Sequence, residues 1–298
     1  MTDPLSAPWP TRIDIRRALV PTRAGQLHAR LSGPGDAGAR RLPLLLLLHM
    51  TPLSSAMYDP LLPRFGIDRL TVAPDRPGFG FSDAPDRPLS MAEYAAATLD
   101  LLDALDVPVC DVLGAHTGSV EAVELAAAFA SRVRRLVLVS IPAYTPVELA
   151  ERRYRLAGVP PPAEDGAHLQ WHWQRRFLYR TPPHDLALFQ WRLLQELLAG
   201  PNVWWPYQAV FDYPMAQRLA GLTQPVLVLA PHDDLWVQTE RVRQNGGLPA
   251  RAQFVDLPQS GLDITYFATD EVADLVRDFL DAPDQGAVAS SSGRTPSS

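Results

Sequence analysis

A run of five leucines, Leu44 to Leu48, ends at His49. An unbroken apolar run of this kind suits a strand buried on both faces, because it offers no polar face to water. Further short apolar runs follow, and helical patterns separate most of them. A strand–helix rhythm at short spacing predicts an α/β fold with a mostly parallel, doubly wound sheet. The inner strands are expected over 42–48, 70–73, 109–113, 133–139, 226–230 and 253–257.

Two outer strands are expected before this run, over 12–20 and 26–32, with a turn at Gly25. Ser90 stands three residues before Glu93, which is the pattern of a capping box at the start of a helix. Two further helices are expected over 118–129 and 271–280.

The rhythm breaks between residues 144 and 222, where the pattern is helical and rich in Trp, Arg and Pro. A helical insertion between two strands of a sheet predicts a cap. The expected organisation is a first part of the core (1–143), a helical cap (144–222), a second part of the core (223–281) and a tail (282–298). The tail is Ser- and Gly-rich without an apolar pattern, so it is expected to be disordered.

Composition excludes several classes of protein. The net charge is −6 and no basic stripe is visible, which argues against nucleic acid as a partner. The single cysteine, Cys110, excludes a disulfide within the chain and a Cys-rich metal site. The N-terminal segment lacks the apolar stretch of a signal peptide, and the leucine run is far too short to span a bilayer. We therefore expect a cytoplasmic protein without a membrane segment; the oligomeric state stays open.

One motif bears on chemistry. The strand over 109–113 runs into Gly114-Ala115-His116-Thr117-Gly118 and then into a helix. This strand–turn–helix context is that of the nucleophile elbow, G-x-S-x-G, in which small residues flank a strained central position. Three other segments accompany it in order: His49-Met50-Thr51-Pro52, then Asp75-Arg76-Pro77-Gly78-Phe79-Gly80-Phe81-Ser82, and then His232-Asp233-Asp234.

Over about residues 12 to 280, these segments resemble the α/β-hydrolase superfamily in its capped branch. The resemblance implies a nucleophile at the elbow, an acid after a late strand and a histidine in the last loop. Here the elbow position holds His116 and the histidine position holds Leu262. The acid position maps best to Asp234, with Asp233 as the close alternative. Two members of the triad are therefore replaced, which argues against an acyl-serine intermediate.

The resemblance also implies an oxyanion hole formed by the backbone N–H groups of Thr51 and Thr117. An imidazole can act as base or acid near neutral pH, so a dyad of His116 and Asp234 could remove a proton from a bound substrate. We expect an enzyme of small, largely apolar or aromatic molecules that works by non-covalent acid–base and oxyanion catalysis, as a cyclase, lyase or isomerase. One alternative is a hydrolase of an ester or related bond in which His116 activates water. Another is a ligand-binding protein without activity.

Further residues are candidates for a supporting or a structural role. His49, His232 and Asp263 could support the dyad, although His49 more readily fits a structural role. Aromatic residues of the cap could line an apolar pocket or form the cap's own core. No spacing of ligands indicates a metal site, and no cofactor is expected. The expected substrate pocket consists of Met50, Trp171, Trp204, Trp205 and Leu262.

Overall fold

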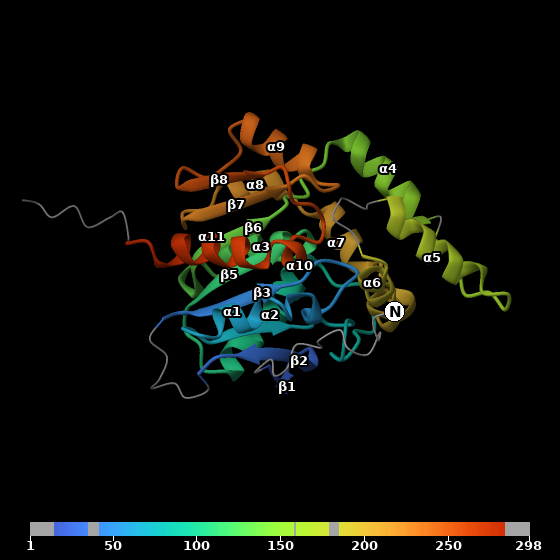
Figure 1. Cartoon of the computed structure of the whole chain (residues 1–298), viewed down its shortest axis with the longest axis horizontal. Helices are drawn as coiled ribbons and strands as arrows, with labels where there is room; N and C mark the ends of the chain where they lie inside the picture. Colours follow the sequence, from blue (N-terminus) through green and yellow to red (C-terminus); the bar gives the residue numbers. More distant parts are fainter. Residues whose placement is uncertain (1–14, 35–41, 158, 179–184, 284–298) are drawn as a thin grey trace, which may run out of the picture.

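The computed structural model describes residues 15–34, 42–157, 159–178 and 185–283. Its centre is an eight-stranded sheet with the order β1-β2-β4-β3-β5-β6-β7-β8 (Figure 1). The strand β2 pairs antiparallel with both β1 and β4, and all other neighbours are parallel. The strands are β1 Arg16–Thr22, β2 Gly25–Ser32, β3 Leu44–Leu48, β4 Thr71–Pro74, β5 Cys110–Ala115, β6 Val133–Val139, β7 Val226–Pro231 and β8 Ala252–Leu257.

The predicted α/β-hydrolase fold with a mostly parallel, doubly wound sheet is confirmed. Each expected strand is present, with ends shifted by a few residues, and β6 has the predicted bounds. The first strand begins at Arg16, whereas it was expected from residue 12; residues 12–14 lie outside the described part.

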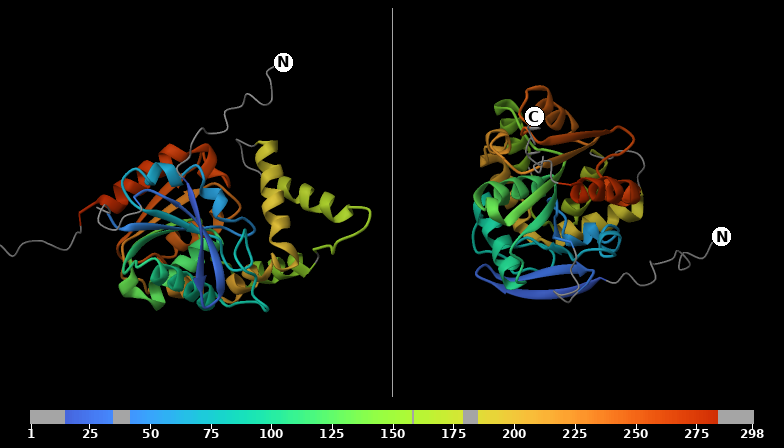
Figure 2. Two further views of the ribbon diagram at one scale, coloured as in Figure 1. Left: turned by 90° about the horizontal axis from the view of Figure 1, so that it is seen from below. Right: turned by 90° about the vertical axis from the view of Figure 1, so that its left-hand side faces the viewer.

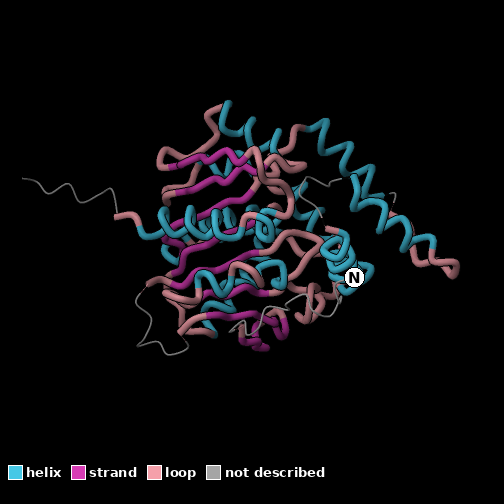
Figure 3. The backbone as a smooth tube through the Cα atoms, in the orientation of Figure 1, coloured by secondary structure: helices cyan, strands magenta, loops and turns pink. Residues whose placement is uncertain are grey.

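The leucine run shows why the sheet is buried on both sides. Side chains alternate along a strand, so Leu44, Leu46 and Leu48 join one apolar cluster and Leu45 and Leu47 join the other. On the first face pack α2 (Met91–Ala104), α3 (Thr117–Ala128), α8 (Met215–Ala220) and α9 (Trp236–Gln244). The second face is covered by α1 (Leu62–Phe65), α10 (Ile264–Phe267) and α11 (Thr269–Asp281) (Figure 3).

The predicted capping box at the start of α2 is present: the Glu93 N–H donates to Ser90 Oγ, and the Ser90 N–H donates to Glu93 Oε2. Five short elements were not foreseen, namely α1, α9, α10 and two 3-10 turns, over Ser55–Tyr58 and Ala130–Arg132. Each spans nine residues or fewer, which gives the sequence few periods of an apolar pattern.

Between β6 and β7 the chain is helical, as predicted, and no strand occurs in the described part of 144–222. We call α4 to α8 the inserted helices. In Figure 2, α5 and α6 stand apart from the sheet beyond one end of its strands. The division into core and cap remains a prediction, and residues 284–298 of the expected tail lie outside the described part. The bounds are α4 Pro146–Ala157, α5 Ala167–Leu178, α6 Leu186–Leu198 and α7 Trp205–Asp212.

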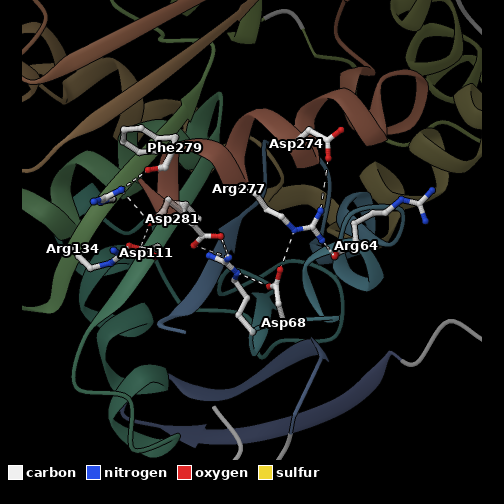
Figure 4. Close-up of polar contacts among 11 residues, drawn as sticks. Arg64, Asp68, Asp111, Arg134, Asp274, Arg277, Phe279 and Asp281 are labelled. Carbon is white, nitrogen blue, oxygen red and sulfur yellow. Dashed lines mark hydrogen bonds and ion pairs between the residues drawn. The ribbon is translucent and has the colours of Figure 1, made fainter. Parts of the chain in front are cut away.

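Arginine–aspartate contacts fasten the end of α11 to the sheet (Figure 4). Arg69 has no exposed side-chain surface, and its Nη2 lies 2.7 Å from Asp281 Oδ2 while its Nε lies 2.8 Å from Asp68 Oδ1. Arg134 pairs with Asp111 and also donates to the carbonyl oxygen of Leu280 at 2.9 Å. The last turn of α11 is therefore held by charged hydrogen bonds as well as by apolar packing.

We expect Arg69→Met to lower the free energy of unfolding by about 2–3 kcal/mol, because it leaves Asp68 and Asp281 without their buried partner. Urea denaturation measures this change. The matched control is Arg64→Met, whose exposed pair with Asp270 should contribute less than about 1 kcal/mol. Equal effects of the two substitutions would contradict the assignment of Arg69 as the anchor.

Within the described ranges, no helix combines the length and the apolar character needed to cross a bilayer.

Candidate active site

The elbow forms at the junction of β5 and α3. His116 adopts φ 52° and ψ −111°, a backbone conformation that a residue with a side chain rarely takes. The two flanking glycines allow the close approach: a Cβ atom on Gly118 would collide with the carbonyl oxygen of Leu48, and one on Gly114 with that of Gly118. The His116 N–H donates to the Val139 carbonyl oxygen at 2.9 Å, which fixes the turn against β6.

The imidazole of His116 points to a carboxylate. Its Nε2 lies 2.8 Å from Asp233 Oδ2. The same oxygen accepts a hydrogen bond from Ser140 Oγ at 2.6 Å, and Asp233 Oδ1 accepts one from the Leu235 N–H at 2.8 Å. Asp233 is buried, with 1% of its side chain exposed. The His116 ring, the Ser140 hydroxyl and the Leu235 N–H together fix the orientation of its carboxylate.

The structure pairs His116 with Asp233 and not with Asp234, the residue expected from the sequence. Adjacent residues of a turn project in different directions, and only Asp233 meets Ser140 at the end of β6. Asp234 instead lines the cavity beside the ring. Burial raises the pKa of Asp234, and the nearby charge of His116 only partly opposes this.

Because His116 Nε2 faces a carboxylate, it carries the proton, and Nδ1 holds the lone pair of the neutral ring. Within the described residues, Nδ1 has no hydrogen-bond partner, and it is not sealed from solvent. Burial acts to lower the pKa of His116, but the charge and hydrogen bond of Asp233 and the charge of Asp234 together raise it above its ordinary value. The ring is thus arranged as a base of increased strength.

A cavity of about 80 Å³ opens at His116. It contains the two expected oxyanion residues, Thr51 and Thr117. As the first residue of α3, Thr117 has no acceptor for its N–H inside the helix. The lining is not the largely apolar surface that the aromatic residues predicted, since it includes four arginines. The lining residues are Met50, Thr51, Pro52, His116, Thr117, Pro142, Tyr144, Arg152, Arg175, Arg176, Arg192, Tyr207, Val210, Asp234, Leu235 and Leu262.

The three proposed supporting residues are engaged elsewhere. His49 is buried, its Nδ1 contacts the Met50 carbonyl oxygen at 2.9 Å, and its Nε2 accepts the Arg76 N–H at 3.0 Å. Burial and the charge of Arg76 lower the pKa of His49 to about 3, so it is a neutral structural residue. His232 contacts Asp256 at 2.9 Å, and Asp263 accepts a hydrogen bond from Arg192 at 2.8 Å. Neither His232 nor Asp263 lines the cavity.

The expected pocket residues separate into three groups. Met50 and Leu262 line the cavity. Trp171 lines an adjoining groove. Trp204 packs between His172 and Tyr207 within the inserted helices, and neither it nor Trp205 lines the cavity.

Sequence reasoning missed Ser140, Tyr144, Arg152 and Arg192 as site residues. One signal for Arg192 was available. Phe189, Arg192 and Glu196 are the buried residues of α6, at helical spacing, so the buried stripe of this helix contains two charges. Such a stripe indicates a buried ionic cluster or a polar site.

Ligand atoms of His116, Asp233 and Asp234 all lie within 4.8 Å of one another, a grouping that could hold a metal ion. However, His116 Nε2 already bonds to Asp233, and the arginines of the cavity would repel a cation. We therefore derive no chemistry from a metal.

Comparison with known proteins agrees with the fold. Residues 45–284 match the model of the alpha/beta hydrolase family. The chain is 26% identical over 278 residues to a 2-hydroxymuconate semialdehyde hydrolase of a Pseudomonas species, covering 85% of this chain and 92% of that protein. It is 28% identical over 236 residues to a carboxylesterase of Bacillus subtilis, covering 77% and 75%.

Among solved structures, an enol-lactonase of Burkholderia xenovorans superposes with a TM-score of 0.74 at 19% identity, covering 90% of this chain and 100% of that one. A hydrolase of Pseudomonas aeruginosa gives 0.73 at 24% identity, covering 90% and 99%. These likenesses concern the fold. The chain belongs to the alpha/beta hydrolase family and is an enzyme of that superfamily.

Proposed function

We propose that the protein hydrolyses an ester or related bond, with His116 activating water and no covalent intermediate. The observation that carries the proposal is the 2.8 Å contact between His116 Nε2 and Asp233 Oδ2 at the elbow. The names of its relatives, a semialdehyde hydrolase and a carboxylesterase, favour hydrolysis over the cyclase, lyase or isomerase chemistry expected first.

In the proposed mechanism, water binds to His116 Nδ1 and gives it a proton while its oxygen attacks the substrate carbonyl carbon. The developing oxyanion accepts hydrogen bonds from the N–H groups of Thr51 and Thr117. Asp233 stabilises the imidazolium that forms. The ring then returns the proton to the leaving group, so that the dyad ends as it began.

A covalent route has no support in the residues. The elbow offers an imidazole where the family's usual pattern has serine, and Leu262 lines the cavity where that pattern has the triad histidine. A serine-directed fluorophosphonate is therefore expected to leave residue 116 unlabelled.

The test is turnover of a panel of aryl esters and lactones in water enriched in ¹⁸O. Single-turnover hydrolysis should place one solvent oxygen in the acid product, with no acyl-enzyme in the mass spectrum. Isomerised or cyclised product without solvent oxygen would instead favour the acid–base chemistry of a cyclase, lyase or isomerase. Tight binding of small molecules without turnover would favour a ligand-binding protein. Either result, or an acyl-enzyme, would overturn the proposal.

The pH dependence follows from the environment of His116. The ring must be neutral to accept a proton, and its pKa lies above the ordinary value of 6.5. We therefore expect kcat/KM to fall as the pH drops through a midpoint above 6.5. A profile of kcat/KM over about pH 5 to 9 measures this limb, which reports the free enzyme. A midpoint below 6.5 would contradict the assignment of His116 as the base.

A further inference from the structure

The inserted helices bring four guanidinium groups to the cavity of His116. Arg152 comes from α4, Arg175 and Arg176 come from α5, and Arg192 comes from α6. All four line a space of about 80 Å³, which is small for so many cations. Their mutual repulsion must be offset by anions of the protein or by a ligand.

Within the described part of the chain, the carboxylates of Asp263 and Glu196 contact members of this group. Asp263 accepts a hydrogen bond from Arg192 at 2.8 Å. Glu196 pairs with Arg176 and lies 3.9 Å from Arg175. Glu196 also binds His172 at 2.8 Å, so its charge is shared among several donors. Among the described residues, the contacts of Asp263 and Glu196 therefore offset only part of the positive charge of the four arginines.

Hydrogen-bond donors remain unused in this cluster. The Nε atoms of Arg176 and Arg192 are buried without a partner, although the two side chains are only 7% and 6% exposed. Buried donors without an acceptor are costly, and a guanidinium is the most demanding of them. Arg152 has no carboxylate contact among the described residues, and its guanidinium stacks on the Tyr144 ring at 4.3 Å.

The two acids beside His116, Asp233 and Asp234, do not supply the missing negative charge and hydrogen-bond acceptors. The oxygens of Asp233 are committed to His116, Ser140 and the Leu235 N–H. Asp234 faces the ring, and the charge of Arg152 acts on it only as a smaller contribution than that of His116. Arg152 lines the cavity without a carboxylate contact among the described residues, so its guanidinium can bind an acceptor from outside the protein.

We propose that the substrate of this enzyme carries a carboxylate, which binds to the arginines of the cavity with Arg152 and Arg192 as its main partners. The inference names the substrate class of the proposed hydrolase and in that respect rests on the proposed function. A planar carboxylate matches the fork of a guanidinium in two parallel hydrogen bonds. A dianionic phosphate would be repelled more strongly than a carboxylate by Asp234, which also lines the small cavity.

The part of such a substrate beyond the carboxylate can bind in a groove next to the cavity. A groove of about 610 Å³ shares Arg152, Arg175 and Tyr207 with the cavity and therefore adjoins it. Its other walls are largely apolar and include Leu156, Trp171 and Phe211. The carboxylate would anchor one end of the molecule at the arginines, and the apolar remainder would extend along this groove.

Binding tests the inference without requiring turnover. Titration calorimetry of the full chain with phenylacetate and with its neutral analogue phenylacetamide separates charge from shape. We expect phenylacetate to bind at least tenfold more tightly, with an affinity that falls as salt is added. The variant His116→Ala should retain this preference. Equal binding of acid and amide, or no binding of either, would overturn the inference.

The variant Arg152→Gln tests whether Arg152 binds the carboxylate of the ligand. A charged hydrogen bond accounts for about tenfold to hundredfold in affinity, so phenylacetate should weaken by that factor while phenylacetamide stays unchanged. The control is Arg153→Gln on the same helix, whose exposed side chain pairs with Asp212 away from the cavity. Arg192→Gln should repeat the loss, and thermal melts without ligand show whether each variant is folded. Unaltered preference for phenylacetate in folded Arg152→Gln and Arg192→Gln would overturn the proposal.

The two proposals fail in different ways. Preferential binding of the carboxylate without turnover of any ester would support the carboxylate site and contradict the proposed hydrolase activity. Ester turnover with equal kcat/KM for mono-4-nitrophenyl succinate and for its methyl ester would support the hydrolase activity and contradict the carboxylate site.

Discussion

Asp233→Asn is expected to lower kcat/KM for ester hydrolysis by about 10²- to 10⁴-fold, although the fold should be unchanged. Asparagine can donate its amide N–H to His116 Nε2, which moves the ring proton to Nδ1. The nitrogen that must accept the proton of water is then already protonated. The substitution also removes the charge that stabilises the imidazolium.

The matched comparison is Asp234→Asn, which changes the neighbouring carboxylate and leaves the hydrogen bond of the dyad in place. We expect a decrease of less than about tenfold, since Asp234 acts on His116 only through its charge. In a His116→Ala background, which by itself should lower activity by a similar factor, Asp233→Asn should add little because the two residues act as a unit. A larger loss of kcat/KM from Asp234→Asn than from Asp233→Asn would support the pairing of His116 with Asp234 that was expected from the sequence.

Gly118→Val is expected to lower the free energy of unfolding by at least about 3 kcal/mol, because the added atoms overlap backbone that cannot move aside. A Cβ atom at this position would meet the carbonyl oxygen of Leu48, which belongs to a central strand of the sheet. Guanidinium denaturation monitored by circular dichroism measures the change.

Gly221→Ala is the control for that substitution. The nearest atoms to a Cβ at Gly221 are 3.6 Å away, and its φ of −82° suits any residue. Its expected effect is within about 0.5 kcal/mol, or slightly stabilising through the unfolded chain. A similar loss of unfolding free energy at both glycines would contradict the interpretation that Gly118 is needed for the close approach of the elbow to β3.

Much of the fold could be predicted because its signals are local. The strand β3 follows from the leucine run, and the start of α2 follows from its capping box. The elbow was predictable for a related reason: Gly114 and Gly118 at fixed spacing mark a turn that only small flanking residues permit. In each case, the residues that determine the element are neighbours in the sequence.

The site could be predicted only in part, because it depends on contacts between distant segments. The partner of His116 is decided by Ser140, which lies 93 residues before Asp233 and holds that carboxylate in place of its neighbour. The arginines come from three different helices, and no local pattern shows that Arg152 and Arg192 face one cavity. Arginine is usually found on the solvated surface, so the residue type alone does not indicate a cavity.

The direct contact between elbow and acid has a consequence for protein engineering. In a serine triad, the histidine lies between the nucleophile and the acid, whereas here the elbow residue itself reaches Asp233. Placing serine at position 116 would thus remove the imidazole without supplying another. Conversion to a serine enzyme would have to begin with two exchanges made together, His116→Ser and Leu262→His.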